Sequence, residues 1–205
     1  MSDTVLGIVI LIPFLIAVFI AGYLLYKFKN RRLTAAWGPL VGLVNGTVSG
    51  DGGGAATSWL TGVWKGRAVA ASLSPGLNQH EDGSAKYNYF DVALRDVPGK
   101  HDWSVEYTRR VIGIGQTGWQ VRADNPALEE ALRAAGVAAL VAPFGETPSH
   151  FQRPSLEYNR LTRLLRYRMD VSPAVTPTPQ RFTELLEMLL RAEEINRQKN
   201  PTAEK

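Results

Sequence analysis

An unbroken run of apolar residues from Val5 to Tyr26 constrains this 205-residue chain more than any other feature. The run contains no charged side chain, and about twenty apolar residues suffice to cross the hydrocarbon core of a bilayer as a helix. Backbone polar groups inside lipid must be satisfied within the segment itself, which favours a helix even though Pro13 removes one hydrogen bond. We therefore predict a single transmembrane helix over residues 5–26.

A cleaved signal peptide is the competing interpretation of this run. Such a peptide has a basic N-terminal region, a shorter apolar core and a cleavage site of small residues. Residues 1–4 carry no Lys or Arg, and the sequence from Tyr23 to Lys29 makes a poor cleavage site. The run is accordingly predicted to remain as an uncleaved anchor.

The basic residues beside the run set the expected orientation. Lys27, Lys29, Arg31 and Arg32 all follow it, and basic residues flanking a membrane helix stay preferentially on the cytoplasmic side. We therefore expect the N-terminus outside the cell (inner) membrane, these four side chains at the lipid surface, and the remaining chain in the cytoplasm. The net charge of +4 is explained in the same way. Without a basic stripe interleaved with aromatic residues, nucleic-acid binding is not expected.

The chain divides into an N-terminal tail at 1–4, the transmembrane helix at 5–26 and a basic juxtamembrane linker at 27–36. A soluble domain follows at 37–199, with a tail at 200–205. The domain has the size of one ordinary folding unit. The chain contains no cysteine, which excludes disulfides, cysteine-ligated zinc and cysteine nucleophiles.

Alternating apolar residues and turn signals predict mostly β-structure in the soluble domain. Residues 59–74 form a hairpin around Lys65-Gly66, and residues 87–95 alternate so that Phe90, Val92 and Leu94 face inward. Further strands are predicted at 103–112, 119–123, 137–142, 156–159 and 164–169, and a short strand or hairpin at 40–49. Most of them are joined by hairpins, so we expect an antiparallel sheet.

Two helices are predicted beside these strands. Asn125 caps the first, which Pro126 begins and Gly136 ends. Thr178 caps the second, which runs to Pro201 with an apolar stripe from Phe182 to Ile195, flanked by Met188 and Leu190. The expected fold is α+β: an N-terminal transmembrane helix, then a mostly antiparallel β domain with two helices packed on one face, the last one long and C-terminal.

A glycine pattern at 113–118 matches the dinucleotide-binding fingerprint G-x-G-x-x-G. That fingerprint requires a helix to follow, because the pyrophosphate binds at a helix N-terminus. Residues 119–123 are predicted to form a strand instead. The glycines are therefore assigned to a hairpin turn, and no cofactor is expected.

The candidates for acid–base chemistry are weak. His80 and Asp82, and His101 and Asp102, lie in polar loops, where solvated side chains are ordinary. No metal-ligand spacing such as H-E-x-x-H is present, so no metal site is predicted. Asp91 and Glu106 are placed on neighbouring predicted strands, where they either face each other or pair with Arg95 or Arg122.

Two further groups are interpreted as possible contact surfaces. Basic residues between 160 and 168 either face solvent or rest against anionic lipid (Arg160, Arg163, Arg166 and Arg168). Trp37, Trp59 and Trp64 belong either to the core or to a partner surface.

The sequence as a whole predicts a non-catalytic interaction or scaffold module that holds a protein partner or assembly at the lipid bilayer. One alternative is a membrane-tethered hydrolase that uses the loop histidines and carboxylates. The other is an accessory subunit of a larger membrane complex, in which Gly7, Ala17, Ala21 and Gly22 allow close helix packing.

Overall fold

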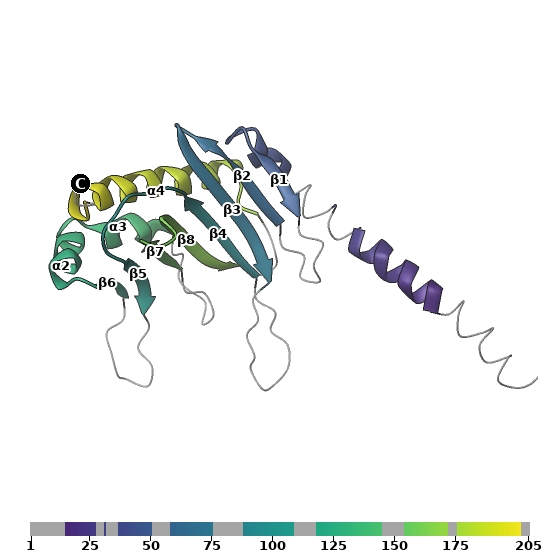
Figure 1. Ribbon diagram of the computed structural model, residues 1–205, viewed down its shortest axis with the longest axis horizontal. Helices are drawn as coiled ribbons and strands as arrows, with labels where there is room; N and C mark the ends of the chain where they lie inside the picture. The colour runs from purple at the N-terminus through teal and green to yellow at the C-terminus, as the bar shows by residue number, and fades with distance from the viewer. Residues whose placement is uncertain are drawn as a thin grey trace, which may run out of the picture.

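The computed structural model describes residues 15–27, 31, 37–50, 58–75, 88–108, 118–144, 154–171 and 176–201. Within these residues, eight strands form one antiparallel sheet that is combined with helices, including a long C-terminal one (Figure 1). The predicted α+β class is therefore confirmed.

The strands are β1 (Thr47–Gly50), β2 (Ser58–Trp64), β3 (Arg67–Pro75), β4 (Asn88–Leu94), β5 (Trp103–Thr108), β6 (Gly118–Ala123), β7 (Ser155–Asn159) and β8 (Leu164–Val171). The helices that follow β6 are α2 (Pro126–Ala134), α3 (Val137–Val141), the short 3-10 helix η1 (Ala142–Phe144) and α4 (Pro179–Lys199). Residues 15–27 and 37–41 are also helical.

The order of strands across the sheet is β1-β2-β3-β4-β8-β7-β5-β6. The late hairpin β7–β8 is inserted between β4 and β5, although β4 and β5 are consecutive in the sequence. Asp91 consequently lies opposite Arg168, and Glu106 lies opposite Ser155, with β8 and β7 between the two carboxylates. The alternative in which Asp91 and Glu106 face each other is therefore excluded, and Asp91 pairs with Arg168 instead of the expected Arg95 or Arg122.

The hairpin β2–β3 has the turn that its sequence predicts. Lys65 and Gly66 adopt φ values of 47° and 77°, and two consecutive positive φ values are typical of the tight turn whose twist matches antiparallel strands. The inward positions on β4 are confirmed as well, because Phe90, Val92 and Leu94 are all fully buried.

The core lies on one face of the sheet, beneath α4 and residues 37–41. The ring of Phe90 on β4 stacks on Trp37 at 6.0 Å and meets Phe182 of α4 edge-on at 6.4 Å. The indole N–H of Trp37 donates to Ser58 Oγ at 2.8 Å, so this buried tryptophan belongs to the core and not to a partner surface. Hereafter, the opposite face of the sheet, which bears Asp91 and Arg168, is called the open face.

The region at 40–49, predicted as a strand or hairpin, mostly forms the end of a short helix and a turn. Residues 37–41 are helical, and only β1 is extended. Asn45, at φ 45°, makes the turn between them. Leu40 and Val44 are four residues apart and both buried, so this short segment follows a helical period that the strand interpretation missed.

A second correction concerns residues 137–142, which were predicted as a strand but form α3 and the start of η1. Val137 and Val141 are both fully buried, as positions four apart on one helical face are. A short apolar run fits either element by pattern alone. Gly136, at φ 73°, ends α2 as predicted, but α3 begins directly after it, so the prediction of two helices is incomplete.

The C-terminal helix α4 begins as predicted, with Thr178 Oγ1 accepting from the Arg181 N–H at 3.2 Å. Its buried stripe is longer than the apolar pattern indicates. Met188 belongs to the core, and the stripe continues through three polar residues that are at most 3% exposed: Glu193, Asn196 and Asn200. Asn200, placed in the tail by the sequence, is therefore packed in the domain.

These polar residues attach α4 to the loop before β5. Asn196 accepts from the indole N–H of Trp103 at 2.7 Å and donates to the Pro98 carbonyl at 2.6 Å. Asn200 Oδ1 accepts from the N–H groups of Lys100 and His101, at 3.0 and 2.9 Å. Every one of these bonds joins residues more than ninety positions apart, so they fix the loop onto the helix.

Residues 15–27 form a helix in which every side chain from Leu15 to Leu25 is exposed, including Phe19 at 80% and Leu25 at 70%. In the part of the chain that the structure describes, no helix is long and apolar enough to cross a membrane. Of the predicted span, residues 5–14 lie outside the described residues, as do Lys29 and Arg32. Lys27 and Arg31 are exposed.

Candidate functional site

A polar pocket of about 360 Å³ lies on the open face, where β5 begins and where β6 and β7 end. The polar side chains that line it include Asp102, Ser104, Glu106, Arg122, Asp124 and Glu157. The strand register brings them together. Ser104 on β5 lies between Arg122 on β6 and Glu157 on β7, and alternation points all three toward the open face.

The charges of this pocket are partly compensated. Asp102 accepts the backbone N–H of Arg160 at 2.6 Å, and Glu157 pairs with Arg166 across the β7–β8 hairpin. Glu106 is half-buried and forms no hydrogen bond or ion pair with any other described residue. The pocket therefore offers hydrogen-bond acceptors, including the Glu106 carboxylate, to a ligand that carries N–H groups, and the guanidinium of Arg122 lies in the same lining without an ion pair among the described residues.

His101 lies beside the pocket but is held in a structural role. Its Nδ1 lies 3.2 Å from Asp124 Oδ1, and its Nε2 lies 3.5 Å from the side-chain nitrogen of Asn125. The Asn125 oxygen caps α2 by accepting from Ala127 and Leu128, so its NH2 group faces the imidazole. The network thus assigns the proton to Nδ1 and leaves Nε2 as an acceptor. Neither nitrogen is free to act on a substrate in this arrangement.

The other two acid–base candidates, His80 and Asp82, lie outside the described residues. The strand ends to which their segment is joined, Pro75 and Asn88, are paired with each other. They lie at the opposite end of β3 and β4 from Arg95 and the loop that carries His101 and Asp102. Within the described residues, no group of three or more acidic or histidine side chains is arranged to hold a metal ion.

The basic residues between 160 and 168 do not form one cationic surface. Arg166 pairs with Glu157, and Arg168 pairs with Asp91 while its guanidinium lies 5.2 Å from the centre of the Tyr89 ring. Arg163, in the β7–β8 turn, donates to the Asp96 carbonyl at 3.3 Å. The paired arginines are matched to carboxylates on neighbouring strands, which leaves them little net charge to offer lipid.

The glycine pattern at 113–118 is followed by β6, not by a helix, and β6 pairs with β5 in an antiparallel hairpin. This outcome agrees with the assignment of the glycines to a hairpin connection. Of the pattern itself, only Gly118 is described; it begins β6 with a φ of 142°.

Fold and site together define an α+β domain whose one antiparallel sheet is covered by helices on one face and carries a polar pocket on the other. Comparison with known proteins finds no matching family, no matching curated protein and no matching solved structure.

Sequence reasoning had found Asp102 and had noticed Glu106 and Arg122, but it missed the pocket. The alternation along β5 and β6 indicates which side chains share a face. It does not indicate that β7 lies next to β5. Without this strand pairing, the position of Glu157 beside Ser104 cannot be predicted, and neither can the side of the pocket that β7 forms.

Proposed function

We propose that this chain is a membrane-anchored, non-catalytic interaction module that holds a protein partner at the cytoplasmic side of the membrane. The observation that carries the proposal is the helix at residues 15–27. Its side chains from Leu15 to Leu25 are all exposed and uncharged, and it continues a run that is uncharged from Val5. A helix with this composition needs an apolar surrounding on all sides, which lipid provides.

The orientation follows from the charges beside the helix. Lys27 and Arg31 are exposed, and Lys29 and Arg32 accompany them in the sequence. Such residues remain on the cytoplasmic side and attract anionic headgroups. The domain that begins at Trp37 is then cytoplasmic.

The polar pocket is the surface on which we place the partner. A Lys or Arg side chain of the partner matches the acceptors of Asp102, Glu106 and Asp124 in charge and in hydrogen-bonding capacity. Such a contact contributes specificity and association rate more than affinity, which suits a module that recruits a partner to a surface.

The anchor is tested by washing membranes that contain the full chain with alkaline carbonate. The wild-type chain is expected to stay with the membranes. The double variant Val18→Asp, Leu25→Asp is expected to be released, because a carboxylate near the centre of the span, as at Val18, costs about 3 kcal/mol, and the second carboxylate at Leu25 adds to this. Val18→Ile with Leu25→Ile is the matched control and should behave as wild type. Release of the wild-type chain by the wash overturns the anchor.

The partner surface is tested by crosslinking in membranes, followed by purification of the full chain in mild detergent. A partner that contacts the pocket is expected to be lost from the variant Glu106→Gln, Asp124→Asn and retained by Glu194→Gln, which removes an exposed carboxylate on α4. Equal recovery of the crosslinked partner from all three chains contradicts the assignment to the pocket.

A second candidate function is that of an accessory subunit in a membrane complex. Ala17 and Ala21 are spaced four residues apart on the helix, and Gly22 lies beside them with open space where a Cβ would be. Small residues at this spacing favour close packing of membrane helices. Ala17→Leu and Ala21→Leu should then disrupt co-purification of other membrane proteins without releasing the chain from the membrane.

A further inference from the structure

The two halves of the sheet differ in charge. Strands β1, β2 and β3 contain no Asp or Glu, whereas β5 and β7 carry Glu106 and Glu157, and the pocket adds Asp102 and Asp124. Three of these carboxylates are paired with basic side chains, but Glu106 has no partner among the described residues, so an anionic lipid surface repels it and meets no carboxylate on β1–β3. If one part of the domain lies against such a surface, the charge distribution favours β1–β3.

The open face of β1–β3 is also chemically suited to a lipid interface. The side chains of β2 that alternate onto it are Trp59, Thr61 and Val63, and Val63 is 51% exposed. Those of β3 are uncharged and small: Ala68, Ala70, Ser72 and Ser74. The helices that cover the sheet pack on the other face, around Phe90 and Phe182.

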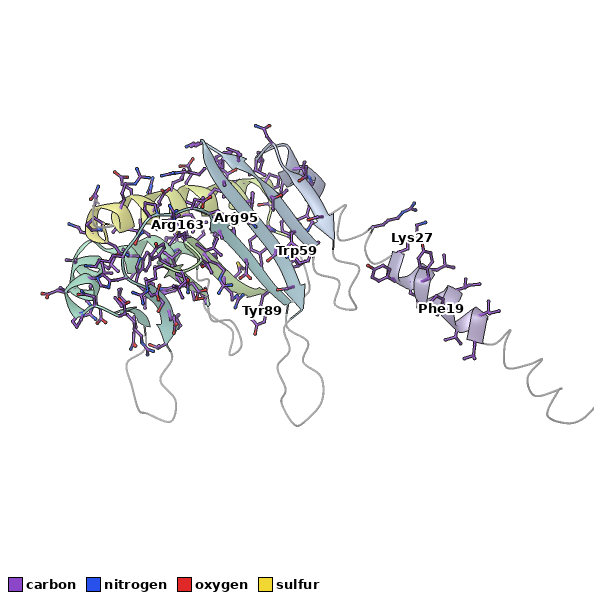
Figure 2. The ribbon with its side chains drawn as sticks, viewed as in Figure 1. Phe19, Lys27, Trp59, Tyr89, Arg95 and Arg163 are labelled. Carbon is purple, nitrogen blue, oxygen red and sulfur yellow. The ribbon has the colours of Figure 1, made fainter. Side chains whose placement is uncertain are left out.

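Two aromatic residues mark one end of this surface. Trp59 on β2 and Tyr89 on β4 lie at the same end of the sheet, and Arg95 and Arg163 lie at the other (Figure 2). Tyr89 lies next to the guanidinium of Arg168. Tryptophan and tyrosine favour the headgroup level of a membrane because each has an apolar ring and a polar edge.

The chain enters the domain at this same end. Trp37 bonds to Ser58 and stacks on Phe90, the residues adjacent to Trp59 and Tyr89 in their strands. Because strand side chains alternate, Ser58 and Phe90 point to the core while their aromatic neighbours point to the open face. Residues 28–36 connect the helix to Trp37, and even a fully extended chain of that length reaches no more than ~32 Å.

We infer that the open face of β1–β4, at the end that carries Trp59 and Tyr89, rests on the headgroup region of the anionic membrane that holds the anchor. The short connection keeps this face close to the surface. Strands β1–β3 contribute no carboxylate, and Asp91 on β4 is paired with Arg168. The acidic residue nearest in the register is Asp170 of β8, opposite Tyr89. The pocket lies on the same face but on the other half of the sheet, at β5, β6 and β7. This inference rests on the proposed membrane anchoring.

The experiment uses the full chain in vesicles of phosphatidylethanolamine and phosphatidylglycerol whose acyl chains carry bromine near the headgroup. Bromine quenches tryptophan fluorescence on contact. The five tryptophans of the chain are Trp37, Trp59, Trp64, Trp103 and Trp119, none of them within residues 5–26, so the signal comes from the domain. We expect Trp59→Phe to lose most of the quenching and Trp119→Phe, on the far edge strand β6, to lose none.

A second variant keeps the probe and changes only the charge. Ser72 lies directly opposite Trp59, so Ser72→Glu places a carboxylate beside the indole, and Ser72→Gln is its uncharged control. Quenching should fall in the first and persist in the second, with near-ultraviolet circular dichroism unchanged in both. Quenching that is equal in Trp59→Phe and wild type, or unchanged by Ser72→Glu, overturns the inference.

The carbonate wash separates this failure from failure of the anchor. If the chain resists the wash but Trp59 shows no quenching, the membrane anchor stands and the contact of the β1–β4 face with the membrane is refuted. A chain that the wash strips from the vesicles refutes both.

Discussion

Asp91 on β4 and Arg168 on β8 face each other across the centre of the sheet and form a two-bond ion pair. Arg168 Nε donates to Asp91 Oδ1 at 2.7 Å, and its Nη2 donates to Oδ2 at 2.8 Å. This bond to Asp91 raises the pKa of the Arg168 guanidinium, because it stabilises the charged form. The pair joins strands that are seventy-seven residues apart in sequence.

We expect Asp91→Ala to lower the free energy of unfolding by about 1–2 kcal/mol, the range for a charged hydrogen bond at a half-buried site. The Asp91 side chain is only 13% exposed, while that of Arg168 is 36% exposed, so water compensates the arginine in part. Glu184→Ala, which removes the exposed pair with Arg181, should change stability by less than about 0.5 kcal/mol. Denaturant unfolding in detergent checks both. Equal effects would show that the central pair contributes no more than a surface pair.

Asn196→Ala should destabilise the domain by roughly 2–3 kcal/mol, because it leaves the indole N–H of Trp103 and the carbonyl of Pro98 buried without their partner. The exposed Gln198, two residues further along α4, provides the control, since its replacement by Ala removes no hydrogen bond found in the described residues. The melting temperature, followed by circular dichroism, measures the difference. A Gln198→Ala variant as unstable as Asn196→Ala would assign the loss to the helix itself.

Gly62→Ala should be among the most damaging small substitutions in the sheet. A Cβ at this position would lie 2.3 Å from the carbonyl oxygen of Val44, which approaches β2 and accepts from the Val63 N–H. Relieving that overlap requires movement of the backbone, at a cost of about 2–3 kcal/mol. Gly42→Ala meets no atom within 4 Å and should be tolerated. Unfolding midpoints that coincide for the two variants would contradict the close approach.

Stability should decline at alkaline pH because of buried tyrosines. Burial raises the pKa of Tyr167, and also that of Tyr158, above the 10.0 of an unperturbed tyrosine. A tyrosine whose pKa is higher in the folded than in the unfolded chain contributes its full stabilisation at any pH below the pKa of the unfolded chain. This stabilisation is lost as the pH rises from the pKa of the unfolded chain to the pKa of the folded one. The decline should therefore begin near pH 10.

Tyr167→Phe isolates one of these contributions. The variant loses the bond from the phenol to the Phe144 carbonyl, about 1 kcal/mol at neutral pH, and should show a shallower decline above pH 10. Denaturant titrations at a series of pH values measure both effects. A slope identical to that of the wild-type chain would exclude Tyr167 as a source of the alkaline sensitivity.

The elements that the sequence predicted correctly are those that depend on neighbouring residues. Lys65-Gly66 makes its turn with positive φ values, and Asn125 caps α2 with the hydrogen bonds expected of an N-cap. The alternation that ends in Leu94 reports directly which side of one strand is buried. Each of these signals lies within a few positions of the structure it determines.

The features that could not be predicted depend on residues far apart. No local pattern indicates that β8 lies beside β4, so the partner of Asp91 was sought on the wrong strand. From the sequence alone, Asn196 and its polar neighbours are expected to be solvent-exposed residues at the end of an amphipathic helix. Asn196 is buried because Pro98 and Trp103 offer it hydrogen-bonding partners from another part of the chain.

The ring cluster of Trp37, Phe90 and Phe182 joins the entry of the domain to its last helix. During synthesis, the ribosome completes β1–β4 long before β8 and α4. Until then, β4 lacks its neighbouring strand β8, and the core face of β1–β4 is not covered by α4. A nascent chain of this kind exposes Phe90 and the flank of β4 while translation continues. Holding the N-terminal segment at a bilayer early would separate such unfinished chains from one another, and so protect them from aggregation until α4 closes the core.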